Sequence, residues 1–137
     1  MKYVDASALL RVLFGEAGTS VPLQAGDRVV SSHLVEVEAF RAVDRERLLG
    51  NLGDPETALK RSELGALLAM LDLAPIDSRV LERAKGSFAV NLRALDALHV
   101  ATAEVLMEAS GEPLEFWTHD DRQAMAALSR GLVVRGV

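Results

Sequence analysis

The chain has 137 residues, half of them apolar, with a formal net charge of −5 and no cysteine. This composition predicts one globular domain over residues 1–137, excludes disulfides and thiolate metal sites, and argues against a disordered chain. No apolar run has the form of a secretory signal or approaches the roughly 18 residues of a membrane helix, so we expect a cytoplasmic protein without a membrane partner. The acidic charge argues against bulk attraction of a polyanion, so binding of a nucleic acid would require local arginines or cations.

Strands and helices are expected to alternate along the chain. Short apolar runs bounded by turn residues predict strands at residues 2–5, 28–31, 73–77, 114–118 and 132–135. Because the third contains Pro75, we expect it at an edge of the sheet. Apolar spacing and helix-start signals predict helices at residues 6–14, 33–49, 56–71, 78–85, 92–108 and 120–129. This alternation favours a three-layer α/β/α fold with a central, mostly parallel twisted sheet of about four to five strands flanked by helices.

Asp96 is the residue that this pattern explains least well. The helix expected at 92–108 is apolar on nearly every side, and Leu92, Val100 and Ala103 share the face of Asp96. A buried carboxylate without a partner is costly and normally survives only when it is paired or bound to metal. The sequence therefore indicates that Asp96 faces other charged groups or an ion.

Three further acids can converge on Asp96 in the predicted fold. Asp5 and Asp120 follow predicted strands, and open parallel sheets bind ligands beyond the carboxyl ends of their strands. Both also precede helices, so capping is the simpler explanation when either is taken alone. For Glu38, within the second predicted helix, the simpler explanation is an ion pair with Arg41 or Arg45.

Carboxylates that converge in one cleft repel each other unless a cation supplies the opposite charge. Mg²⁺ and Mn²⁺ prefer oxygen ligands, and either ion can activate a water and stabilise charge on a phosphoryl oxygen. The chain has no cysteine and no histidine pair at ligand spacing, so this set of acids favours metal-assisted phosphodiester hydrolysis. The hypothesis places one ion among Asp5, Glu38 and Asp96, with Asp120 completing the site or holding a second ion.

Four segments resemble the motifs of PIN-domain nucleases, in particular the VapC-type toxins of bacterial toxin–antitoxin pairs. In chain order they are YVDASAL at 3–9, SHLVEVEAFRA at 32–42, LRALDALHVATA at 92–103 and THDDR at 118–122. Their order and spacing cover essentially the whole chain. The resemblance implies a compact PIN-like α/β domain that acts as a Mg²⁺- or Mn²⁺-dependent endoribonuclease. It also implies a homodimer and inhibition by a cognate antitoxin protein.

Matched residue by residue, the resemblance assigns metal binding and catalysis to Asp5, Glu38, Asp96 and Asp120. It implies accessory roles for Ser7, Thr118 and Asp121. Asp121 is an alternative or a helper to Asp120, and their adjacency leaves that choice open.

Basic side chains near the motifs are candidates for contact with RNA. They are Arg41, Arg93 and Arg122, and the alternative for each is a salt bridge with a neighbouring acid. His99 lies one helical turn after Asp96 and could orient that carboxylate by a hydrogen bond, although a place at the edge of the core is the favoured interpretation.

Two other functions stay open at this stage. An aspartate at a strand end is also the nucleophile of aspartate-dependent phosphatases that require a metal. However, Asp5-Ala6-Ser7 lacks the second aspartate two residues further on that such enzymes use. The other alternative is a non-catalytic PIN-like binding module whose acids are structural.

Overall fold

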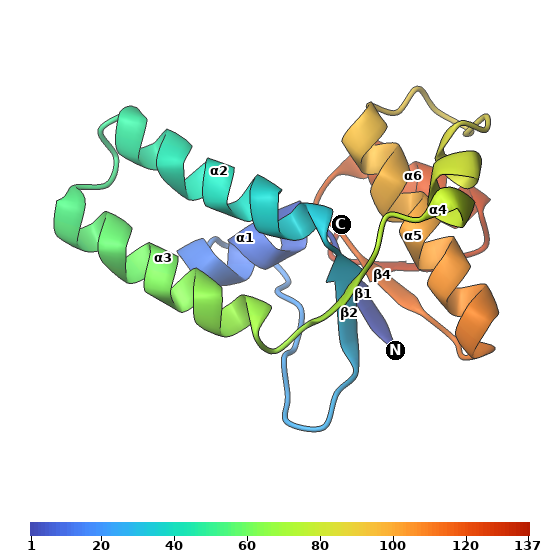
Figure 1. Ribbon diagram of the computed structural model, residues 1–137, viewed down its shortest axis with the longest axis horizontal. Coiled ribbons are helices and arrows are strands. Elements are labelled where there is room, and N and C mark those ends of the chain that lie inside the picture. The colour runs from blue at the N-terminus through green and yellow to red at the C-terminus, as the bar shows by residue number, and fades with distance from the viewer.

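Five short parallel strands form the central sheet of the protein, whose computed structural model describes residues 1–137 (Figure 1). In chain order they are β1 (Lys2–Val4), β2 (Val29–Ser32), β3 (Asp72–Ala74), β4 (Glu115–Trp117) and β5 (Val133–Arg135). They lie in the order β3-β2-β1-β4-β5, and every neighbouring pair is parallel. β3 is an edge strand, as predicted, and Pro75 follows it directly.

Six helices connect and cover these strands. They are α1 (Ala6–Phe14), α2 (Leu34–Leu48), α3 (Asp54–Leu68), α4 (Ser78–Ala84), α5 (Ala94–Ser110) and α6 (Asp121–Ser129). In Figure 1, α1, α2 and α3 lie to one side of the sheet and α4, α5 and α6 to the other. The predicted three-layer α/β/α architecture is therefore confirmed. None of the helices combines the length and apolar character that crossing a membrane requires.

Two apolar clusters fill the space between these layers. Neighbouring residues of a strand point to opposite faces of a sheet, and Val4 packs in one cluster while Tyr3 packs in the other. The first cluster joins the sheet to α1, α2 and α3 through buried side chains such as Leu9 and Leu64. The second joins it to α5 and α6, with Val100 among its buried residues. Burial of these two faces fixes how the helices approach the carboxyl ends of the strands.

The strand order changes direction beside β1. From β1 the chain crosses to β2 and β3 on one side, whereas β4 and β5 lie on the other. Val4 pairs with Trp117, so the residues that follow these strands, Asp5 and Thr118, emerge side by side. A change of direction in an open parallel sheet is where ligands characteristically bind.

The first turn of α5 corrects one expectation. The helix begins at Ala94, and its buried stretch starts only at Ala97, because the first turn extends to the rim of a cleft. Leu95 is 45% exposed, and the Asp96 side chain is 20% exposed. Asp96 is therefore half-buried at the cleft wall, and not fully buried as a helix that is apolar on nearly every side would place it.

Candidate active site

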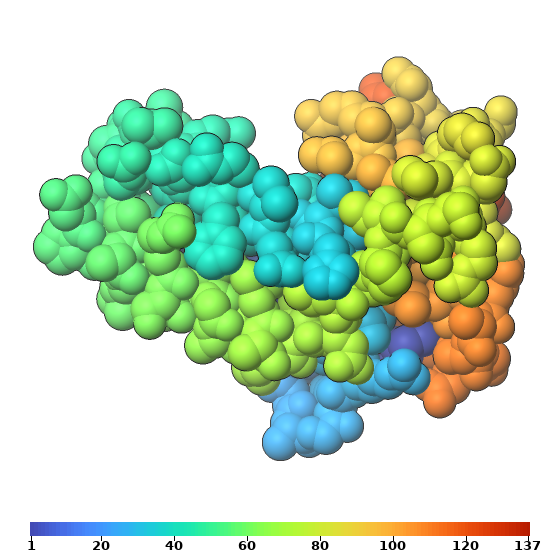
Figure 2. Space-filling model, in the orientation of Figure 1, coloured from blue at the N-terminus to red at the C-terminus, as the bar shows by residue number.

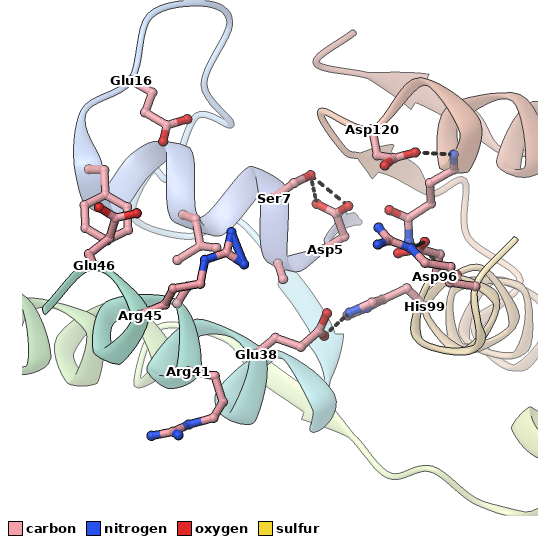
Figure 3. Close-up of a pocket in the computed structure, with 16 residues that line it drawn as sticks. Asp5, Ser7, Glu16, Glu38, Arg41, Arg45, Glu46, Asp96, His99 and Asp120 are labelled. Carbon is pink, nitrogen blue, oxygen red and sulfur yellow. Dashed lines mark hydrogen bonds and ion pairs between the residues drawn. The ribbon is translucent and has the colours of Figure 1, made fainter. Parts of the chain in front are cut away.

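A cleft of about 790 Å³ lies beyond the carboxyl ends of β1 and β4, between α1, α2 and the start of α5. Figure 2 shows the surface hollowed between α2 and the first residues of α5. The residues that line the cleft include all four predicted acids, which are Asp5, Glu38, Asp96 and Asp120. In Figure 3 these carboxylates surround a common space, although they come from four different parts of the chain.

Asp5 is the most buried of the four acids, at 3% exposed. Its carboxylate accepts hydrogen bonds from the Ser7 hydroxyl (2.8 Å), the Thr118 hydroxyl (2.7 Å) and the Ala8 backbone N–H (2.8 Å). The bond from Ala8 caps α1, so the simpler explanation for Asp5 is also correct. Burial raises the pKa of Asp5, and the hydrogen bonds from Thr118, Ala8 and Ser7 only partly oppose this shift.

Two hydroxyl groups connect Asp5 to the residues after β4. The Ser7 hydroxyl accepts a hydrogen bond from the His119 backbone N–H at 2.8 Å, and the Thr118 hydroxyl accepts one from the Asp120 backbone N–H at 3.1 Å. Because each hydroxyl also donates to Asp5, the end of β1 and the loop before α6 are held together. Ser7 and Thr118 therefore hold the Asp5 carboxylate in place.

Gln123 is a site residue that the sequence analysis missed. It is 1% exposed, lines the cleft from α6, and donates from its side-chain amide to the Asp96 backbone carbonyl at 3.3 Å. Its amide oxygen lies 3.1 Å from the Thr118 hydroxyl. The only signal in the sequence is a polar residue three positions after Asp120, which is common on exposed helices, so the pattern alone did not distinguish it.

Asp96 and Asp120 both line the cleft and are close enough to repel each other. Burial is the main cause that raises the pKa of Asp96; Arg93 opposes the shift, and the negative charge of Asp120 adds to it. Arg93 Nε lies 3.4 Å from the Asp96 carboxylate, while its own side chain is 86% exposed. Asp120 accepts a hydrogen bond from the Gln123 backbone N–H at 2.8 Å and so caps α6. Asp120, like Asp5, is both a cap and a cleft acid.

Glu38 does not form the ion pair with Arg41 or Arg45 that is the simpler explanation for a glutamate on this helix. Its carboxylate lies 2.6 Å from Nε2 of His99, and Arg41 instead pairs with Asp44 at 3.1 Å. His99 is 1% exposed, and its partners are Glu38 and Tyr3. The alternative in which His99 bonds to Asp96, which the sequence analysis did not favour, was therefore wrong.

The remaining candidates divide between the cleft and the outer surface. Arg41 and Arg93 line the cleft, although Arg41 points away from the acids in Figure 3. Arg122 donates to the Asn91 backbone carbonyl at 3.3 Å and does not line the cleft. Asp121 is exposed at the start of α6 and also lies outside it. Of the two adjacent aspartates, only Asp120 faces the cleft.

The donor set fits a hydrated divalent cation. All the acidic donors are carboxylate oxygens, and two of these carboxyls have pKa values raised by burial, so a cation would supply missing positive charge. No group of three or more acidic or histidine side chains is close enough to hold an ion by direct contacts alone. This differs from the hypothesis of three direct ligands, but Mg²⁺ usually keeps several waters beside one or two carboxylates.

Comparisons with known proteins agree with this geometry. Residues 2–128 match the PIN domain family. Ribonuclease VapC46 of Mycobacterium tuberculosis is 35% identical over an alignment of 135 positions that covers 96% of this chain and 94% of that protein. Ribonuclease VapC47 of the same species is 31% identical over 140 residues, covering 97% and 94% respectively. The crystal structure of PAE2754 from Pyrobaculum aerophilum has a TM-score of 0.62 at 21% identity, covers 97% of this chain and 87% of that one, and supports the fold.

Proposed function

The chain belongs to the PIN domain family, and from this premise we propose that it is a VapC-type endoribonuclease that hydrolyses RNA phosphodiester bonds with the help of Mg²⁺ or Mn²⁺. The observation that carries the proposal is the meeting of four acids from separate parts of the chain in one cleft. The relatives named ribonuclease match nearly the full length of the chain, so the proposal applies to the whole domain.

In this proposal Asp5, Glu38, Asp96 and Asp120 hold the cation, in part through water. When bound, the ion supplies positive charge to the scissile phosphate and makes an attacking water more acidic. The chain itself keeps Asp5 in place through the hydroxyls of Ser7 and Thr118. It also keeps the cleft wall rigid, because Asp5 and Asp120 are caps of the helices that begin there.

Arginines at the cleft offset the acidic charge of the molecule. Arg41, Arg45 and Arg93 line the cleft, and Arg45 forms no salt bridge there. The exposed pair between Arg93 and Asp96 is worth little free energy, so Arg93 can exchange this partner for an RNA phosphate. Single-stranded RNA, whose unstacked bases can be spread apart, suits so small and open a cleft.

The setting that goes with this function is a type II toxin–antitoxin pair in the cytoplasm. The partners are then the RNA substrate, a cognate antitoxin protein that inhibits cleavage, and a second copy of the chain in a homodimer. The names of the two ribonuclease relatives support this setting through their family.

A cleavage assay tests the proposed function and its alternatives together. We expect the purified protein to cut cellular RNA when Mn²⁺ or Mg²⁺ is present and to stop when EDTA removes the ion. The protein should release no phosphate from a small phosphomonoester, because Ser7, which bonds to Asp5, stands where a phosphatase needs its second aspartate. Phosphate release without RNA cleavage would favour the phosphatase, and inactivity on both substrates would favour a binding module.

The adjacent aspartates provide a matched pair of variants. Asp120→Asn keeps a good helix cap but removes a charge from the cleft, whereas Asp121→Asn removes a charge outside it. We expect Asp120→Asn to slow RNA cleavage at least about tenfold, because loss of an outer partner of a metal site has an effect of that size. Asp121→Asn should leave the rate unchanged. Initial rates at saturating Mn²⁺ measure both. An equal fall in the cleavage rate of the two variants would show that Asp120 has no specific role in catalysis.

A further inference from the structure

Glu38 is linked to the interior of the protein by a chain of two hydrogen bonds. Its carboxylate lies 2.6 Å from Nε2 of His99, and Nδ1 of the same ring lies 2.7 Å from the Tyr3 hydroxyl. The three residues come from α2, α5 and β1. Tyr3 and His99 are 0% and 1% exposed, so water cannot replace either partner.

The order of these groups favours one arrangement of the protons, in which His99 is neutral and carries its proton on Nε2. A carboxylate only accepts hydrogen bonds, so Nε2 of His99 must carry the proton that it donates to Glu38. A neutral imidazole with a proton on Nε2 has an acceptor at Nδ1, and the phenol of Tyr3 is placed to donate to it. The ring is also held by packing, because Tyr3 meets it edge-on at 5.9 Å and stacks on Phe116 at 5.2 Å.

The bond between His99 and Glu38 is the single side-chain hydrogen bond between α2 and α5. These helices form opposite walls of the cleft, and His99 lies one turn after Asp96 on α5. Without this bond, Glu38 could turn along its own helix towards Arg41, three residues away, where side chains of opposite charge readily pair. Figure 3 shows the contact aiming the Glu38 carboxylate away from Arg41 and across the cleft.

We propose that His99 is a positioning residue that holds the Glu38 carboxylate ready for the divalent cation, and that Tyr3 selects the His99 tautomer which can do so. The proposal rests on the proposed function, in which Glu38 belongs to the cation site. His99 leaves the second oxygen of Glu38 without a protein partner and therefore available to the ion or its water. Outer partners of this kind orient metal ligands and restrict their motion before the ion arrives.

Two substitutions at position 99 test whether the hydrogen bond from Nε2 to Glu38 is what holds Glu38 in place. The side-chain amide of His99→Gln reaches about as far as Nε2 and can still donate to Glu38, whereas the shorter amide of His99→Asn lies near the position of Nδ1 and cannot. We expect His99→Asn to weaken Mn²⁺ binding about 10- to 100-fold in calorimetric titration, and His99→Gln to weaken it by no more than about threefold. His33→Asn is the matched control, because it removes an exposed histidine–glutamate pair at the start of the same α2 helix, and it should bind Mn²⁺ like the wild type.

A spectroscopic measurement supports the same test without a change at His99. Nitrogen NMR of the wild-type imidazole should show a proton on Nε2, and Tyr3→Phe, which removes only the hydroxyl, should shift the Nδ1 signal and weaken Mn²⁺ binding by a few-fold. The proposal is overturned by an unprotonated Nε2, by wild-type Mn²⁺ affinity in folded His99→Asn, or by equal losses in the Gln and Asn variants. Absence of Mn²⁺ binding by the wild type would instead overturn the proposed function and this inference together.

Discussion

Replacing Asp96 with asparagine is expected to abolish RNA cleavage while the fold persists. The Asp96 carboxylate lines the cleft beside Asp120, and the two negative charges together attract a cation. An asparagine of the same shape retains an oxygen but not the charge. We expect the cleavage rate to fall by about 10²- to 10³-fold or more, the scale seen when a single preorganised electrostatic contact is removed from an active site.

The same substitution should not destabilise the protein in EDTA. The pKa of Asp96 is raised above its ordinary value of 3.8, so the folded protein binds this proton more tightly than the unfolded chain does. Stability is therefore lost as the pH rises from the ordinary pKa through the raised one, and the full penalty remains at neutral pH. Asp96→Asn lacks this titration, so its Tm at pH 7 should equal or exceed that of the wild type, with a smaller difference below pH 4.

Thermal unfolding and cleavage of one RNA under the same conditions check both halves of this expectation. The control is Asp121→Asn, which removes an equivalent charge from outside the cleft. A variant at position 96 that cuts RNA at the wild-type rate would remove Asp96 from the mechanism. A variant that has lost activity because it is unfolded would show that Asp96 has a structural role instead.

The largest expected effect on stability is that of Leu64→Ala in α3. Leu64 is 0% exposed and belongs to the apolar cluster that joins α3 to α1, α2 and the sheet. Truncation of a buried leucine to alanine removes apolar contact and leaves a cavity, at a cost of about 2–5 kcal/mol. For a domain of this size the Tm should then fall by roughly 10–20 °C. Because the cluster holds α2, it also holds Glu38 in the cleft.

Leu59→Ala is the matched control on the same helix. Leu59 is 57% exposed, so the identical truncation should change the free energy of unfolding by no more than about 0.5 kcal/mol. Urea unfolding followed by circular dichroism gives both values. Similar losses in the two variants would mean that α3 is not anchored through Leu64. Cleavage by Leu64→Ala, measured well below its Tm, should stay within a few-fold of the wild type.

The architecture was largely readable from the chain because its signals are local. Alternating apolar runs and helix-start residues predicted each strand and helix to within a few residues, including β3 as the edge strand. The main exception is α5. Apolar periodicity reports that Leu95 and Asp96 lie on a helix, but it does not report that the first turn of this helix extends to the cleft rim.

The site was only partly readable, because its decisive contacts join residues far apart in the chain. Asp5 and Asp120 each cap a helix and also line the cleft, so these two explanations do not exclude each other. The simpler explanation for Glu38 was an ion pair with an arginine of its own helix, yet its partner is His99, 61 positions further on. Short-range spacing favours the first pairing, and only the approach of α5 to α2 produces the second.

A calorimetric titration of the metal-free protein with Mn²⁺ tests the central claim most directly, because that claim is that the acids of the cleft hold a divalent cation. We expect saturable binding to the wild type, and binding at least about tenfold weaker to Asp96→Asn. Wild-type protein that takes up no Mn²⁺, or an Asp96→Asn variant that binds it equally well, would contradict the account.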